Sequence, residues 1–195
     1  MNNIYFKFII LFFIEILISR NVVQNWLVTN ESFIKSENKL INFTYTITHP
    51  DFNNEGADLN GQILTTSKGR FKLTIGPRIV FSDGDSWTIY DQRTTQAIIQ
   101  EPDSTLYEKI FSNITYEHIS KLLSVSILKD NKATIYNDKE KIVLNFEDGI
   151  ISSVLYHLNS LKVDISKIQL DIIPNVDDSL FYLNDSSVMM IDLRE

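Results

Sequence analysis

The 195-residue sequence contains no cysteine. This absence excludes disulfide bonds, thiolate metal ligands and a lipid-modified N-terminal cysteine. The sequence also has no run of lysine and arginine, and its formal net charge is −7. Because phosphate backbones are bound by concentrated cations, we expect no nucleic-acid partner. The length and the otherwise ordinary composition predict one globular domain with a sizeable core.

Motifs for catalysis and metal binding are missing as well. The sequence has no nucleophile elbow, P-loop or dinucleotide-binding glycine pattern. Its three histidines, His49, His118 and His157, are far apart and have no metal-ligand spacing. Asp83-Gly84-Asp85 lacks the remainder of a calcium loop and is typical of a hairpin turn. A hydrolase would need a converging pair such as Asp83 with Asp91, and turn chemistry explains both. We therefore expect no enzyme activity, no metal and no cofactor.

The first twenty residues differ from the rest of the chain. Residues 4–19 are apolar apart from Lys7, Glu15 and Ser19, and Lys7 supplies the positive start of a secretory signal. Glu15 interrupts the run and no small-residue cleavage site follows it, which keeps an uncleaved membrane anchor open as an alternative. That run is shorter than a membrane span requires. We predict a signal peptide over residues 1–20 and an exported domain over residues 21–195.

Hydrophobic periodicity changes along this domain. Residues 22–36 have helical spacing, and residues 41–47 alternate as a half-buried strand does. Five short strand-like segments follow between turn residues, which indicates an antiparallel meander. Helix-like spacing returns after Pro102-Asp103-Ser104. Four more strands are predicted over 132–137, 141–147, 151–158 and 162–173.

A sheet of nine or ten strands curls, because twist accumulates across it. We predict a mainly β fold with some α: a single curled antiparallel sheet with a helical lid that covers an apolar cavity. For each apolar residue of the sheet, a filled core is the alternative to a ligand cavity. The candidate cavity residues are Phe43, Tyr45, Ile63, Phe71, Leu73, Trp87, Ile89 and Ile99, with the small Ala97 among them. The candidate lid residues are Leu106, Ile110, Ile114, Ile119 and Leu122.

Several short motifs follow one another in a set order. Gly61 opens one strand, Ser82-Asp83-Gly84 forms a turn, and the last seventeen residues read SLFYLNDSSVMMIDLRE. The remaining motifs are Arg70-Phe71-Lys72, Trp87 with Tyr90, and Gln96-Ala97. In this order, behind a signal-like segment, they resemble the periplasmic outer-membrane lipoprotein carrier protein family, LolA. The resemblance spans most of residues 22–195, and its specific motifs lie within 61–100 and 180–194.

This resemblance implies an unclosed β-barrel with a helical lid, and a carrier in the periplasm. Such a carrier, by similarity a monomer, shields the acyl chains of lipoproteins between the inner and outer membranes. Its implied partners are acylated lipoproteins, an inner-membrane ABC transporter that releases them, and an outer-membrane lipoprotein receptor. The family carries a turn arginine associated with holding the lid shut, and here this arginine is either missing or replaced by Lys68. The alternative function is a lipid- or lipoprotein-sensing module of the same fold, similar to the N-terminal domain of RseB-type stress regulators.

Overall fold

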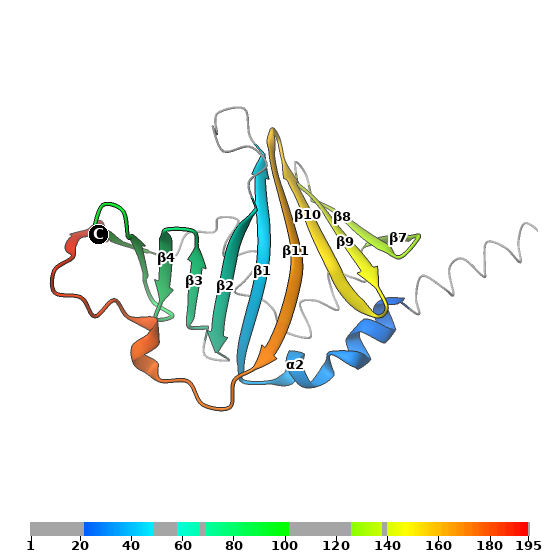
Figure 1. Cartoon of the computed structure of the whole chain (residues 1–195), viewed down its shortest axis with the longest axis horizontal. Coiled ribbons are helices and arrows are strands. Elements are labelled where there is room, and N and C mark those ends of the chain that lie inside the picture. Colours follow the sequence, from blue (N-terminus) through cyan, green and yellow to red (C-terminus); the bar gives the residue numbers. More distant parts are fainter. Residues whose placement is uncertain (1–21, 49–57, 67–68, 102–125, 138–139, 195) are drawn as a thin grey trace, which may run out of the picture.

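In the part of the chain that the structure describes, twelve strands form one sheet, which curls but does not close (Figure 1). The computed structural model describes residues 22–48, 58–66, 69–101, 126–137 and 140–194. The strands lie in the order β12-β6-β5-β4-β3-β2-β1-β11-β10-β9-β8-β7. One half of the sheet comprises β1 (Asn38–Thr48), β2 (Leu59–Thr66), β3 (Phe71–Ile75), β4 (Arg78–Ser82), β5 (Trp87–Asp91) and β6 (Gln96–Gln100). The other strands are β7 (Ile127–Lys129), β8 (Lys132–Asn137), β9 (Glu140–Glu147), β10 (Ile150–Leu158), β11 (Leu161–Ile172) and β12 (Met189–Asp192).

Helices are few among the described residues. Residues 22–29 are helical and α2 (Glu31–Lys35) continues them, as the spacing over residues 22–36 predicts. Lys35 contacts Glu31 one turn earlier in α2, a spacing that favours a helix. A single 3-10 turn, η2 (Asp178–Phe181), lies in the C-terminal segment. None of the helices in the described part of the chain is long and apolar enough to cross a membrane.

The predicted helices after Pro102 fall outside the described residues, as does the whole candidate lid. The predicted strands are confirmed, and the meander from β2 to β6 is antiparallel throughout. The sheet is not entirely antiparallel, however, because β12 pairs with β6 in parallel. After β11 the chain runs past the neighbouring strands and reaches β6 from its far side (Figure 1). Parallel pairing requires a long connection of this kind, because a tight hairpin joins only antiparallel strands.

The two faces of the sheet bury different residues. The inner face carries the core, in which Phe43, Leu73 and Trp87 pack with Trp26 of the first helical segment and with Phe33 of α2. The outer face carries Phe81, Ala97 and Ile99, and the C-terminal segment from residue 173 onward packs over part of it. Both faces of β4, β5 and β6 are therefore partly apolar, unlike a sheet with one solvated side.

Tyr156 of β10 gives the core a dependence on alkaline pH. Its side chain is 1% exposed, and burial, followed by the nearby Glu140 carboxylate, raises its pKa to about 12. An unfolded tyrosine ionises near pH 10. The protonated Tyr156 therefore stabilises the folded state below the pKa of the unfolded chain. This stabilisation is lost as pH rises from about 10 to about 12.

We expect the free energy of unfolding to fall as pH rises across that range. In Tyr156→Phe its slope against pH should be smaller by the equivalent of about one proton. Denaturant titrations at several pH values measure the slope. Tyr136→Phe is the matched control, because Tyr136 is 62% exposed. Equal slopes for wild type and Tyr156→Phe would show that the buried tyrosine does not hold its proton.

Candidate functional site

An aliphatic row crosses the inner face from strand to strand. The residues pair directly across neighbouring strands, so each lies beside the next on the same face. In sheet order from β11 to β12 the row is Leu170, Ile41, Ile63, Leu73, Val80, Ile89, Ile98 and Ile191. With strands about 4.8 Å apart, it extends for roughly 30 Å.

Exposure increases along this aliphatic row toward the sheet edge. Ile63 and Leu73 are fully buried, Ile89 and Ile98 are half-buried, and Ile191 is 36% exposed. Met189 of β12 and Leu193, the residue after β12, lie on either side of Ile191 and are 60% and 59% exposed. The row therefore joins the core to an open apolar margin at the edge of the sheet.

The structure brings most of the candidate cavity residues together. Six of them are buried in one inner-face cluster, and Ile89 packs against it half-buried. The six are Phe43, Tyr45, Ile63, Phe71, Leu73 and Trp87. In the described residues these six fill a core. The ring planes of Phe71 and Trp87 meet almost at right angles, 5.6 Å apart at their centroids.

Ile99 and Ala97 do not belong with the cavity candidates. Ile99 pairs with Thr88 and Ala97 with Tyr90, whereas Trp87 and Ile89 point to the inner face. Side chains alternate along a strand, so Ile99 and Ala97 lie on the outer face. The inner-face residue of β6 is Ile98. The sequence does not reveal this, because Ile98 and Ile99 are both isoleucine and alternation cannot tell which of them points inward.

A pocket lies on the outer face, under the C-terminal segment. Its volume is about 310 Å³. The sheet contributes Phe81, Asp83, Ser86, Thr88 and Ile99, and the C-terminal segment contributes Phe181, Tyr182, Leu183, Asn184, Met190 and Arg194. We call it the outer pocket. The predicted apolar cavity was placed on the other face, so the outer pocket is a site that was not anticipated from the sequence.

Phe181 and Arg70 hold the C-terminal segment against the sheet. Phe181 is 1% exposed, and the Arg70 guanidinium lies 5.8 Å from the centre of its ring. Arg70 also contacts Asp178 at 2.9 Å, and this hydrogen bond raises the pKa of Arg70. The Arg70 side chain is 13% exposed, so its charge is partly shielded from solvent. The outer wall of the pocket thus depends on a buried aromatic ring and one ion pair.

Asp83 shapes the turn between β4 and β5. Its Oδ1 accepts hydrogen bonds from the backbone N–H groups of Asp85 at 2.9 Å and Ser86 at 2.8 Å. Burial acts to raise the pKa of Asp83, but these hydrogen bonds outweigh it and the pKa is lowered. Gly84 takes a φ of 104°, as expected for a glycine in such a turn. Asp83 therefore places a negative charge at the wall of the outer pocket.

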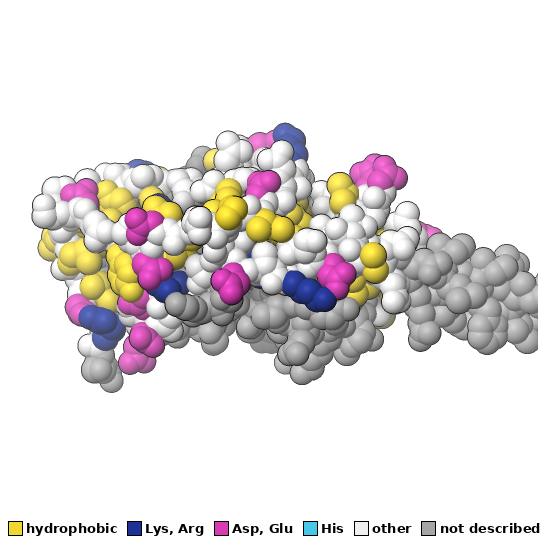
Figure 2. All heavy atoms as spheres, turned by 90° about the horizontal axis from the view of Figure 1, so that it is seen from below, with side chains coloured by type: hydrophobic (Ala, Val, Ile, Leu, Met, Phe, Trp, Pro, Cys, Tyr) yellow, Lys and Arg dark blue, Asp and Glu magenta, His cyan; other side chains and the backbone are white. Residues whose placement is uncertain are grey.

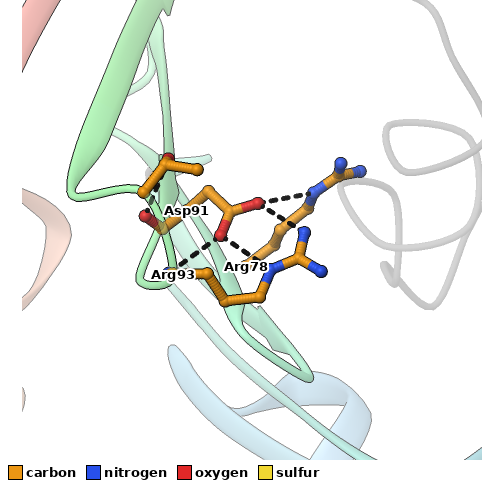
Figure 3. A network of polar contacts seen from close by, with 4 residues as sticks. Arg78, Asp91 and Arg93 are labelled. Carbon is orange, nitrogen blue, oxygen red and sulfur yellow. Dashed lines mark hydrogen bonds and ion pairs between the residues drawn. The ribbon is translucent and has the colours of Figure 1, made fainter.

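Asp91 belongs to a separate network (Figure 3). Its carboxylate accepts from Arg93 at 2.8 Å and lies 3.5 Å from Arg78, and the side-chain hydrogen bond from Arg93 is the main reason its pKa is lowered. Asp83 precedes β5 and Asp91 ends it, a separation of roughly 15 Å at 3.3 Å per residue. The two carboxylates cannot act together on one substrate atom.

Metal-binding geometry is not found in the described ranges, where no three His, Asp or Glu side chains gather around a common point. His157 lies on β10, half-buried. His49 and His118 fall outside the described residues.

Comparisons with known proteins give no family. No family model matches the chain, and no curated protein matches it. Among solved structures, one match is described as an "uncharacterized conserved protein" from Thermus thermophilus. The two share 8% sequence identity with a TM-score of 0.49, over 87% of this chain and 98% of that chain. At that level the likeness supports no functional argument.

Proposed function

We propose that this protein is a periplasmic carrier that shields the acyl chains of lipoproteins and shuttles them from the inner to the outer membrane. The observation that carries the proposal is the aliphatic row, which leads from the buried core to an exposed edge of an unclosed sheet. The resemblance of the 61–100 and 180–194 motifs to the LolA family supports the same function, as does the signal-like segment over residues 1–20.

The aliphatic row suits an acyl chain in length and in chemistry. Each acyl CH₂ removed from water contributes about 0.8 kcal/mol, so partial cover of two or three chains is enough to keep a lipoprotein in solution. The exposed end of the row at Ile191, together with its neighbours Met189 and Leu193, offers a first apolar contact that costs no unpacking. To cover more of the acyl chain, half-buried side chains such as Ile89 and Ile98 must first separate from the residues that pack against them.

In this proposal the mature domain takes its cargo from an inner-membrane ABC transporter and delivers it to an outer-membrane lipoprotein receptor. The helical lid over residues 102–125 is part of the proposal. It is the segment that would move aside for cargo. No group in the described residues needs to react, because loading and release are changes in apolar contact alone.

The test is the transfer of a triacylated lipoprotein from inner-membrane vesicles that contain the cognate transporter and ATP. We expect the protein without residues 1–20 to form a soluble one-to-one complex, detected by size exclusion and native mass spectrometry. Ile98→Glu is expected to lower its yield by about tenfold, because a carboxylate placed on the aliphatic row must be desolvated beside the chain.

Ile79→Glu is the matched control. Ile79 is half-buried like Ile98, but it pairs with Tyr90 and so lies on the outer face. Its complex yield should equal that of wild type. A complex that forms equally well with a cargo lacking the acylated cysteine would contradict the proposal. So would a folded wild-type protein that captures no cargo. Free lipid in the purified protein would then favour the sensing module.

A further inference from the structure

A buried lysine lies on the inner face of the sheet, among apolar residues. Lys39, the second residue of β1, is 8% exposed and pairs with Thr65 of β2. Thr65 in turn pairs with Phe71, which belongs to the inner-face core. Directly paired residues share a face, so Lys39 lies on the side of the core. Lysine is almost never buried to this extent unless its charge is paired.

The contacts of Lys39 leave its charge without a counter-ion. Its Nζ donates to the backbone carbonyl oxygen of Ser36 at 2.7 Å. None of the carboxylates in the described ranges forms an ion pair with it. Burial lowers the pKa of Lys39, since an ammonium is less stable away from water. An ammonium has three hydrogens to donate, so this site has donors to spare.

Lys39 belongs to a row of inner-face residues that we call the rim row. It runs from Ile172 through Lys39, Thr65, Phe71 and Ser82 to Trp87. Each member is the first or last residue of its strand or lies next to it, so the row follows one end of the sheet. Hydrophobic side chains are open to solvent at this end, where β1 begins and β11 ends (Figure 2). Ile172, which pairs with Lys39, is 47% exposed.

The rim row runs directly beside the aliphatic row. On β1 the next inner-face residue after Lys39 is Ile41, roughly 7 Å away at 3.3 Å per residue. From Ile41 the aliphatic row continues to Ile98 on β6, five strand spacings or roughly 24 Å further. Across from Lys39, the 9% exposed Thr65 adds a hydroxyl that can also donate. A single cation at the rim and a long apolar track beside it complement a molecule with an anionic head and one apolar tail.

We propose that the inner face binds a long-chain fatty acid, with its carboxylate on Lys39 and Thr65 and its alkyl chain along the aliphatic row. A carboxylate carries one charge, which matches the single ammonium, whereas a phosphate head carries more charge and more acceptor oxygens. The hydrogen bond from an ammonium to a carboxylate is also stronger than one between neutral groups. Binding would pair a charge that otherwise lies buried alone.

This site goes beyond the carrier function. The acyl chains of a lipoprotein are attached through their carboxyl groups, so they bring no charge to Lys39. The alkyl chain of a fatty acid would use the aliphatic row in the same way as an acyl chain, with Ile89 and Ile98 separating from the residues that pack against them. The charged head is therefore the feature that distinguishes the two ligands.

Equilibrium binding of radiolabelled palmitate and hexadecanol to the full chain tests the proposal. The two have tails of equal length, but the head of hexadecanol is neutral. We expect hexadecanol to bind about tenfold more weakly than palmitate, because it cannot pair with the ammonium. Lys39→Met keeps an apolar side chain of similar length and removes the charge, so it should weaken palmitate binding about tenfold and leave hexadecanol binding unchanged. Thr65→Val should weaken palmitate binding about threefold.

Two controls separate binding from folding. Removing a buried charge without a counter-ion should not destabilise the protein, so Lys39→Met should unfold at the same denaturant concentration as wild type or a higher one. Lys72→Met should keep the wild-type affinity, because Lys72 pairs with Phe81 on the outer face and its ammonium lies over that ring.

Unchanged palmitate affinity in Lys39→Met would overturn the proposal. Tighter binding of lysophosphatidate than of palmitate would overturn the assignment to a carboxylate. Equal affinity for palmitate and hexadecanol would also overturn it, but would leave the aliphatic row in use. The failure of this proposal can thus be distinguished from the failure of the carrier function.

Discussion

Gly61→Ala is expected to lower the free energy of unfolding by about 3 kcal/mol, at the upper end of the cost of overpacking a core. Gly61 pairs with Phe43 across β1 and β2, and the Phe43 ring lies over the glycine. A Cβ at this position would lie 2.3 Å from two ring carbons, far inside van der Waals contact. The ring cannot move away freely, because Phe43 is 6% exposed and packs within the inner-face core.

The double variant Gly61→Ala with Phe43→Leu separates this clash from other effects of the alanine. The smaller side chain makes room for the Cβ, so the two substitutions should cost less together than the sum of their separate costs, with a coupling of about 1 to 2 kcal/mol. Denaturant unfolding of the four proteins measures the coupling. Additive costs would mean that the ring does not clash with residue 61.

Alternation and turn chemistry predict much of this fold. The features that they do not predict are two short strands and the parallel pairing of β12. Strands β1 to β6 are marked by alternating residues and by turns such as Asp83-Gly84. β7 and β12 are only three and four residues long, too short for a periodic signal. That β12 joins β6 in parallel depends on where residues 173–188 run, and nothing local in the sequence specifies that path.

The candidate site shows the same limit. Buried residues such as Leu73 and Trp87 could be named from the sequence because their neighbours alternate clearly. Ile98 and Ile99 are both isoleucine, so only the pairing with β5 decides which one joins the aliphatic row. The row itself is a property of register between eight strands, and the outer pocket comes from segments far apart in the chain. Neither leaves a pattern within one stretch of sequence.

Phe181→Ala is expected to release the C-terminal segment while the sheet remains folded. Truncating a fully buried phenylalanine costs about 3 to 5 kcal/mol when the surroundings cannot separate. This segment can separate, because it leaves the sheet after β11 and contacts it mainly through Phe181, the Arg70–Asp178 pair and β12. The free energy lost in Phe181→Ala should therefore be no larger than the free energy with which the C-terminal segment docks on the sheet. It should appear as local opening of this segment.

Hydrogen exchange distinguishes local from global opening. We expect the amides of Met189 and Leu193, which bond to β6, to exchange about a hundredfold faster in Phe181→Ala, the factor that corresponds to roughly 3 kcal/mol. The amide of Leu73, deep in the meander, should exchange at its wild-type rate. Leu180→Ala is the matched control, since Leu180 is the preceding residue and is 43% exposed. If Leu73 instead accelerated together with Met189, the C-terminal segment would be part of the cooperative core.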